Sequence, residues 1–138
     1  AAAICDRLKR GSYVGLDRSK TAIDAARKRC ADQIAAGKAR FVLAPLAGTV
    51  FGKERFDCVL AINVNAFWVN GEAEVAAVRA ALRPKGQLLL AYEPPSPSSE
   101  TTTLTKLRMG LTAGGFTRVR NVSATRGSKL QMGVFASA

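Results

Sequence analysis

Apolar and polar residues alternate along this chain in stretches whose lengths match two kinds of secondary structure. Short apolar stretches, most of them bounded by Gly, Pro, Asn, Asp or Ser, predict β-strands. One of them, residues 56–62, is apolar at nearly every position, which is typical of a central parallel strand covered on both faces. The predicted strands are residues 13–17, 40–43, 56–62, 87–92, 116–122 and 130–135.

Between these strands, apolar residues recur three or four positions apart, which predicts helices. Ser19 is suited to cap a helix that ends near Gly37, with an apolar stripe formed by Ile23, Ala26, Cys30 and Ile34. Further helices are predicted over residues 1–9, over residues 71–82 with Val75, Val78 and Leu82 buried, and around Leu104, Leu107 and Leu111.

This order of elements predicts an α/β fold in one domain over residues 1–138. Alternating strands and helices favour a mostly parallel sheet with helices on both faces. The short connection between the last two strands predicts an antiparallel hairpin at the end of the sheet. Pro94, Pro95 and Pro97 stand among serines and predict a stiff loop.

The composition indicates a globular protein without a membrane span. Apolar residues make up 48% of the 138, and no apolar run approaches the roughly 18 residues that a spanning helix requires. No signal-peptide pattern is found at the start, so we expect a cytoplasmic location. The three cysteines are far apart in sequence, which predicts buried, reduced thiols. With no His in the chain, a histidine base and a His-ligated metal are excluded, and we expect no metal site.

The formal net charge of +11 has two interpretations. A strongly basic chain is typical of nucleic-acid binding. The basic residues, however, are concentrated in residues 1–40 and 101–138 and do not form a cluster interleaved with aromatic residues. A solvated basic surface is therefore favoured, and an RNA-binding α/β module stays open as an alternative.

Polar residues follow three of the predicted strands, at the edge of the sheet where ligands bind in such folds. Asp17 ends the first strand, and its carboxylate is suited to accept two ribose hydroxyl groups. Asp17 is also placed to cap the next helix, but Ser19 is available for that role. Ribose binding is therefore the favoured interpretation of Asp17.

The strand at residues 56–62 leads into Asn63, Val64 and Asn65 and then into Phe67 and Trp68. Asn side chains both donate and accept hydrogen bonds, so these residues are candidates for the floor or lid of a pocket. The alternative is that the two aromatic rings only cover the core.

Tyr92 and Glu93 end the strand at residues 87–92, next to the predicted proline loop. They are suited to orient a substrate or to act as a base. The alternative is a packed tyrosine and a solvated glutamate.

The order of these segments resembles the class I S-adenosylmethionine-dependent methyltransferases, which have a Rossmann-like fold. The likeness covers roughly residues 13–95. The segments that carry it are Val14-Gly15-Leu16-Asp17-Arg18-Ser19, Phe56-Asp57-Cys58-Val59, Asn63-Val64-Asn65-Ala66-Phe67-Trp68, Leu82-Arg83-Pro84-Lys85-Gly86-Gln87-Leu88 and Tyr92-Glu93-Pro94-Pro95.

The resemblance implies a set of cofactor and substrate residues. Asp17, with the adjacent Arg18, would lie at the cofactor ribose, and Leu46 would pack against adenine. Asn63 and Val64 would lie beside the methionine part of S-adenosylmethionine. The methyl-transfer pocket would be bordered by Asn65, Phe67 and Trp68, with Tyr92 and Glu93 near the same crevice.

The sequence also departs from the family pattern. The family's first strand and its Gly-rich loop would fall before Ala1, so we expect a partial methyltransferase domain. Where many members carry an acidic residue for adenine, this chain has Ala44-Pro45-Leu46. Without the central strand, either the strands at residues 13–17 and 56–62 pair directly or unpaired N–H and C=O groups remain between them. We therefore expect weak or no binding of S-adenosylmethionine by this chain.

The leading functional hypothesis is methyl transfer from S-adenosylmethionine to a small-molecule acceptor. Such a transfer depends mainly on in-line positioning, so it does not require a histidine base. Two alternatives remain, namely a fragment of an NAD-binding dehydrogenase and the non-catalytic RNA-binding module. The sequence identifies neither a catalytic residue nor the oligomeric state.

Overall fold

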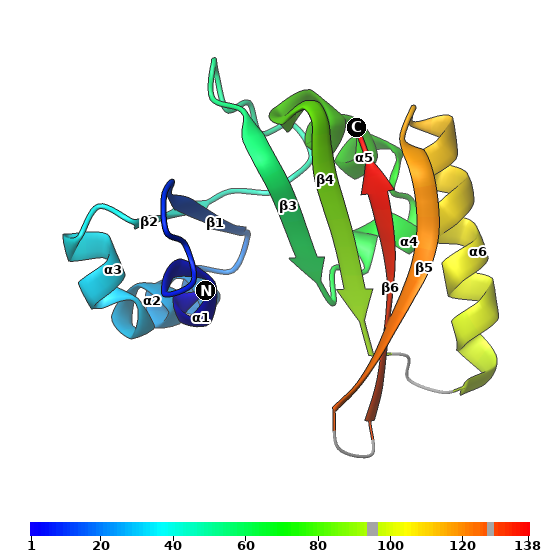
Figure 1. The fold of residues 1–138 in the computed structure, drawn as a ribbon, viewed down its shortest axis with the longest axis horizontal. Helices are drawn as coiled ribbons and strands as arrows, with labels where there is room; N and C mark the ends of the chain where they lie inside the picture. Colours follow the sequence, from blue (N-terminus) through cyan, green and yellow to red (C-terminus); the bar gives the residue numbers. More distant parts are fainter. Residues whose placement is uncertain (94–96, 127–128) are drawn as a thin grey trace. The chain divides into compact units, whose positions relative to one another are not determined.

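The computed structural model describes residues 1–93, 97–126 and 129–138 (Figure 1). The chain divides into two compact units, Ala1–Thr49 and Val50–Ala138, which are described in turn. Pro94 and Pro95 lie outside the described residues.

The first unit packs three short helices against a parallel pair of strands. Residues Tyr13 to Asp17 pair in register with Ala39 to Leu43. The elements of this unit are α1 (Ala2–Cys5), β1 (Tyr13–Asp17), α2 (Lys20–Arg29), α3 (Ala31–Ala35) and β2 (Ala39–Leu43).

The helices of the first unit are shorter than the sequence predicted. Residues 6–9 do not continue α1, and the long helix expected up to Gly37 is broken at Cys30, where φ is −115° and ψ is 27°. The break removes Ile34 from the apolar stripe of α2, because the helical phase is not continued into α3. Ile34 is consequently 38% exposed, whereas Ile23 and Cys30 are buried as predicted.

Gly15 in the middle of β1 is required by close packing. A Cβ atom there would lie 2.5 Å from a ring carbon of Phe41 on β2, which is much closer than a van der Waals contact. Phe41 also contacts Tyr13, with ring centroids 6.0 Å apart. The glycine therefore lets the Phe41 ring lie across β1, and this packing closes the small core of the unit.

The second unit is a four-stranded mixed sheet in the order β3-β4-β6-β5. β3 and β4 are parallel, whereas β6 is antiparallel to both β4 and β5, so the predicted C-terminal hairpin is confirmed. The elements are β3 (Phe56–Ile62), α4 (Ala66–Val69), α5 (Glu72–Ala81), β4 (Leu82–Tyr92), α6 (Pro97–Ala113), β5 (Thr117–Arg126) and β6 (Lys129–Ser137).

Several boundaries in the second unit differ from the prediction, including the starts of α6 and β4. Pro97 was expected in a loop but is the first residue of α6, a position that suits its fixed φ and missing N–H. β4 begins at Leu82 rather than at residue 87. Leu82 pairs with Phe56, and the register then shifts so that Cys58 pairs with Gln87.

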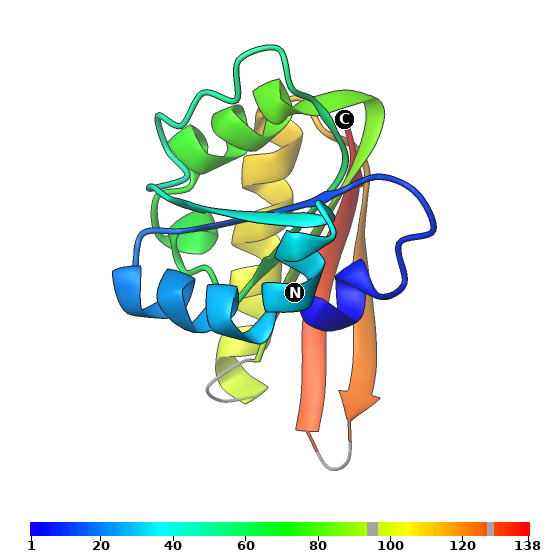
Figure 2. The same ribbon diagram turned by 90° about the vertical axis from the view of Figure 1, so that its left-hand side faces the viewer.

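All helices of the second unit lie on one face of its sheet, as Figures 1 and 2 show. Side chains that point toward the helices are buried, including Leu88, Leu90 and Val134. On the other face Leu60 lies in register with Leu89, which is opposite Phe135. Leu60 is 39% exposed. Within this unit, helices therefore cover one face of the sheet.

β3 is an edge strand, not the central strand that its apolar sequence predicted. Ile62 near its end is 61% exposed, and Cys58 is exposed rather than buried. Among the described strands, β3 has β4 as its single neighbour and β1 has β2. The sequence left two outcomes open for β1 and β3, namely direct pairing or unpaired backbone groups. The two strands belong to different sheets, and among the described strands each has one edge without a strand partner.

Candidate functional site

Asp17 lies at the carboxyl end of β1 with an exposed carboxylate. Its Oδ1 atom accepts a hydrogen bond from the backbone N–H of Ser19 at 2.8 Å. Ser19 Oγ in turn accepts from the N–H of Ala22 at 3.2 Å and so caps α2. Asp17 is therefore not the cap of α2, and within the described part of the chain its Oδ2 atom has no hydrogen-bond partner.

Two basic residues of α2 pair with Asp24. Lys20 Nζ is 2.6 Å from Oδ2 of Asp24, and Arg27 lies 3.9 Å from the same carboxylate. The hydrogen bond from Lys20 lowers the pKa of Asp24, and the charges of Lys20 and Arg27 lower it further. Arg18 is exposed. The ends of β1 and α2 thus present an acidic oxygen to solvent beside a cationic side chain.

The segment after β2 leaves the sheet next to Asp17. The N–H of Ala44 donates to the carbonyl oxygen of Asp17 at 3.0 Å, which continues the pairing of the two strands by one residue. The chain then turns, because the N–H of Thr49 donates to the carbonyl of Leu46 at 3.2 Å. Leu46 is half-buried in this turn. The structure therefore brings together Asp17 and the segment predicted to pack against adenine.

A second group of predicted site residues lies where β3 and β4 end, within the second unit. Asn63 has φ of 54°, in the left-handed region that Asn tolerates better than most residues. Its N–H donates to the carbonyl of Ala91 at 2.9 Å, and its Oδ1 accepts from the N–H of Glu93 at 3.0 Å. Asn63 therefore fastens the ends of the two strands together.

The aromatic residues of this group are divided between core and surface. Phe67 and Tyr92 are each 4% exposed, the position of core side chains. Trp68 is half-buried, and its ring centroid lies 5.3 Å from that of Tyr92. Glu93 is exposed. Of this set, Trp68 and Glu93 are thus the side chains best placed to reach a ligand.

The sequence did not predict α4, which starts immediately after Asn65. Asn65 takes the N-cap position but makes no capping hydrogen bond with its side chain, which is exposed. Val64 precedes it and is half-buried. Gly71 then allows the chain to pass close to α4, since a Cβ there would lie 2.5 Å from the backbone oxygen of Phe67. The Asn65 amide therefore remains available for a ligand.

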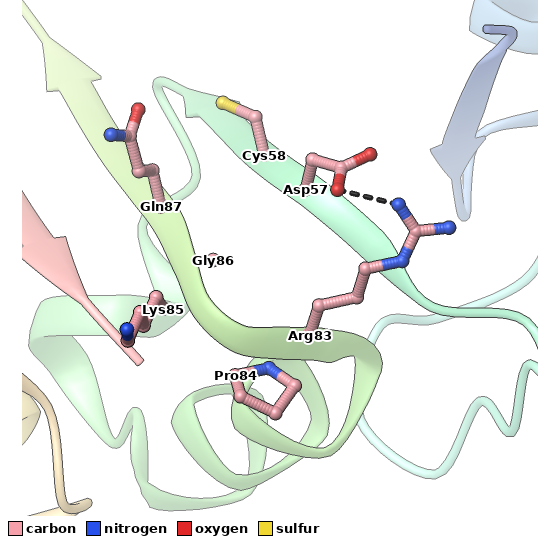
Figure 3. Close-up of a pocket in the computed structure, with 7 residues that line it drawn as sticks. All are labelled: Asp57, Cys58, Arg83, Pro84, Lys85, Gly86 and Gln87. Carbon is pink, nitrogen blue, oxygen red and sulfur yellow. Dashed lines mark hydrogen bonds and ion pairs between the residues drawn. The ribbon is translucent and has the colours of Figure 1, made fainter.

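A shallow depression of about 340 Å³ lies at the opposite end of β3 (Figure 3). Arg83 Nη1 and Asp57 Oδ1 form an ion pair across it at 2.5 Å. Partial burial raises the pKa of the Cys58 thiol, and the adjacent Asp57 carboxylate raises it further. The thiol is therefore a weak nucleophile near neutral pH. Because ligands of open α/β sheets bind at the carboxyl ends of the strands, this depression is not the predicted site.

Two other kinds of feature are absent from the residues that the structure describes. No group of three or more His, Cys, Asp or Glu side chains there is arranged to hold a metal ion. No described helix combines the length and the apolar character needed to cross a membrane.

The sequence profile of the family described as "Methyltransferase domain" matches residues 1–86. This match covers more than half of the 138 residues, and it includes Asp17, Leu46 and Asn63. The chain therefore belongs to the methyltransferase domain family. A comparison with curated proteins found no match.

Three solved structures share the fold at low sequence identity. The S-adenosylmethionine-dependent methyltransferase SibL in its apo form aligns with a TM-score of 0.71 at 19% identity, over 91% of this chain and 43% of SibL. Magnesium protoporphyrin IX methyltransferase from Synechocystis PCC 6803, with bound SAH, gives 0.68 at 15% identity over 91% of this chain and 64% of that protein. The cyclase SpnF gives 0.75 at 11% identity over 98% of this chain and 69% of SpnF.

These alignments confirm the Rossmann-like methyltransferase fold with its C-terminal antiparallel hairpin. The chain spans less than half the length of SibL and less than two thirds of the protoporphyrin methyltransferase. SpnF shows in addition that this fold is found in a cyclase, so the fold by itself does not define the reaction.

Proposed function

We propose that this methyltransferase domain acts in the transfer of a methyl group from S-adenosylmethionine to a small-molecule acceptor. Family membership supports the reaction class. The main structural support is the environment of Asp17. Its carboxylate is exposed at a strand end, because Ser19 and not Asp17 caps α2. A carboxylate that does not cap a helix is suited to accept hydrogen bonds from ribose hydroxyl groups.

The residues of the first unit fit the nucleoside end of the cofactor. Asp17 would accept the ribose hydroxyls, and the Leu46 side chain would pack against the adenine ring. Arg18 adds a positive charge at the same strand end. The acidic residue that many family members place after the second strand is replaced here by Ala44-Pro45-Leu46, so adenine would be held by packing and backbone groups.

The residues of the second unit fit the methionine end and the acceptor. When bound, the cofactor supplies an electrophilic methyl group on a sulfonium. Asn63 and Val64 would lie beside the methionine part, and the Asn65 amide, Trp68 and Glu93 would orient the acceptor. Phe67 and Tyr92 are buried and would support these residues from the core. The Glu93 carboxylate is suited to accept a proton from the acceptor atom or to pair with a positive charge on it.

The contacts of the basic residues favour a small-molecule acceptor over nucleic acid. In the α2 cluster of Arg27, Lys28 and Arg29, the guanidinium of Arg27 donates to the carbonyl of Phe41 at 3.1 Å and pairs with Asp24. Arg27 of the α2 cluster therefore helps to hold the first unit together. The α2 cluster contains no aromatic residue on which a base could stack.

Titration with S-adenosylmethionine, followed by backbone amide NMR, tests the proposal and detects weak binding. We expect shifts of the Ser19, Ala44 and Leu46 amides that saturate. Asp17→Asn keeps Oδ1 as an acceptor for Ser19 and so preserves the turn, but it should weaken binding about tenfold or more because the charge is lost.

Asp32→Asn is the matched control, since Asp32 is an exposed acid on α3 of the same unit. Shifts of equal size and affinity in Asp17→Asn and in the unsubstituted chain would overturn the ribose assignment. Transfer of labelled methyl to RNA but not to small-molecule mixtures would overturn the acceptor assignment.

A further inference from the structure

Two cysteines from separate helices lie in the same small core of the first unit. Cys5 ends α1 and is 0% exposed, and Cys30 occupies the break between α2 and α3 and is 1% exposed. They share one cluster of buried side chains, whose other members are Ile23, Ala39 and Phe41. Two of the five buried side chains in this core are therefore thiols.

A hydrogen bond next to the two cysteines holds their helices together. Gln33 Nε2 donates to Asp6 Oδ1 at 2.9 Å. Asp6 directly follows Cys5, and Gln33 is one turn beyond Cys30. Figure 2 shows α1 beside the place where α2 ends and α3 begins. The backbone segments that carry the two thiols are thus held side by side by the shared core and by the Gln33–Asp6 hydrogen bond at the surface.

The electrostatics of the cluster agree with this proximity. Burial raises the pKa of the Cys5 thiol, and the nearby Cys30 sulfur adds to that increase. The pKa of the Tyr13 hydroxyl is raised by burial and then by Cys5 and Cys30. Cys5 and Tyr13 are therefore protonated at neutral pH.

We propose that Cys5 and Cys30 form a redox pair that closes to an intramolecular disulfide when the chain meets a low-molecular-weight disulfide such as oxidised glutathione. Cys5 or Cys30, once deprotonated, attacks a glutathione sulfur, which forms a mixed disulfide and releases one glutathione thiolate. The other cysteine then attacks the protein sulfur of the mixed disulfide and releases the second glutathione thiolate. The protein loses two protons and two electrons, and oxidised glutathione is reduced to two glutathione molecules.

The disulfide would close a loop that contains the whole of β1 and the whole of α2. Asp17 and Ser19 lie in this loop, so oxidation would restrain the strand end that the proposed ribose contact uses. A cross-link of this kind stabilises a folded unit chiefly by restricting the unfolded chain. Oxidation is therefore expected to raise the unfolding midpoint of the first unit. The redox pair itself does not depend on the proposed function.

The experiment equilibrates the full chain with oxidised glutathione, alkylates the remaining thiols and identifies the cysteines by peptide mass spectrometry without reduction. We expect a linked pair of peptides containing Cys5 and Cys30, with Cys58 either alkylated or glutathionylated. The reaction should be faster at pH 9 than at pH 7, because the attacking species is the thiolate and burial raises the pKa of Cys5.

Cys58→Ser is the matched control and should form the linked peptide unchanged, since Cys58 is exposed and lies in the other unit. Cys5→Ser and Cys30→Ser should each leave the remaining buried cysteine without a linked partner. A folded chain in which Cys5 and Cys30 stay reduced, or become glutathionylated separately, would overturn the proposal. Circular dichroism of each variant shows whether the fold is retained.

Discussion

At the scale of single residues, Asn63 connects backbone conformation with the candidate site. Its positive φ ends β3 sharply, and its side chain replaces the next rung of the β3–β4 ladder by accepting from the Glu93 N–H. The sequence indicated a polar residue at a strand end. It did not indicate that the side-chain oxygen would be used inside the protein, which leaves the amide nitrogen as the group available for a ligand.

We predict that Asn63→Ala destabilises the second unit more than Asn63→Gly does. Both changes remove the acceptor for Glu93, which costs about 1 kcal/mol. Glycine adopts a positive φ without strain, whereas the left-handed conformation destabilises alanine by about 1 kcal/mol more. Chemical denaturation measures the free energy of unfolding. Equal losses of unfolding free energy in the two variants would show that the left-handed conformation at residue 63 does not affect stability.

At the scale of elements, the start of α2 gives different roles to two neighbouring residues, Asp17 and Ser19. The Ser19 side chain accepts a hydrogen bond from the N–H of Ala22 in the first turn of the helix, and this leaves the Asp17 carboxylate exposed to solvent. The predicted stripe of α2 is confirmed for Ile23 and Cys30 and fails at Ile34, because the break at Cys30 changes the helical phase. No Gly or Pro marks that break, so periodicity alone extended the helix.

Ser19→Ala is expected to cost about 1 kcal/mol in the stability of the first unit, since the N–H of Ala22 loses its acceptor. The hydrogen bond from the Ser19 backbone to Asp17 should remain, because it does not involve the side chain. Amide hydrogen exchange at residues 20–23 measures the loss. Ser12→Ala, at an exposed position outside any helix, is the control and should leave this exchange unchanged.

At the scale of the whole molecule, the two units differ in the amount of core that stabilises them. The first unit has a cluster of five buried apolar side chains around a two-stranded sheet. The second has a four-stranded sheet with long apolar side chains such as Leu88, Leu107 and Leu111 buried to 1% exposure or less. The unequal cores imply unequal local stability.

Hydrogen exchange should therefore be slower in β4 and β6 than in β1 and β2. The inner strands of the second unit have partners on both sides, whereas β1 and β2 have only each other among the described strands. Mass spectrometry of peptides from residues 87–92 and 13–17 compares the two directly. Protection of β1 equal to that of β4 would contradict the expected order.

Alkaline pH is predicted to destabilise the first unit. Burial raises the pKa values of Cys5 and Tyr13 above their ordinary values of 9.0 and 10.0, so the folded state keeps protons that the unfolded chain loses. The stability is complete below about pH 9 and falls as the pH rises through the folded-state values. Thermal unfolding followed by circular dichroism at a series of pH values measures the trend. Tyr13→Phe should reduce the loss above pH 10, and an unchanged profile in this variant would contradict the role of Tyr13.

The sequence by itself determined the elements whose signal is local. The strands at Tyr13–Asp17 and Phe56–Ile62, the helix at Glu72–Ala81, the Ser19 cap and the C-terminal hairpin all follow from apolar spacing and turn residues within a few positions. The same local patterns identified Asp17 and the segment Asn63–Trp68 as candidate ligand positions. The family match includes both.

Only the tertiary structure decided which strands and side chains are covered. An apolar stretch such as Phe56–Ile62 predicts burial, but burial depends on which elements pack against the strand. Here Leu60 and Ile62 are exposed on the face opposite the helices of their own unit. In the same way, the nearness of Cys5 to Cys30 and the bond between Asn63 and Glu93 join residues distant in sequence. Such contacts arise from packing, because no local pattern along the chain contains them.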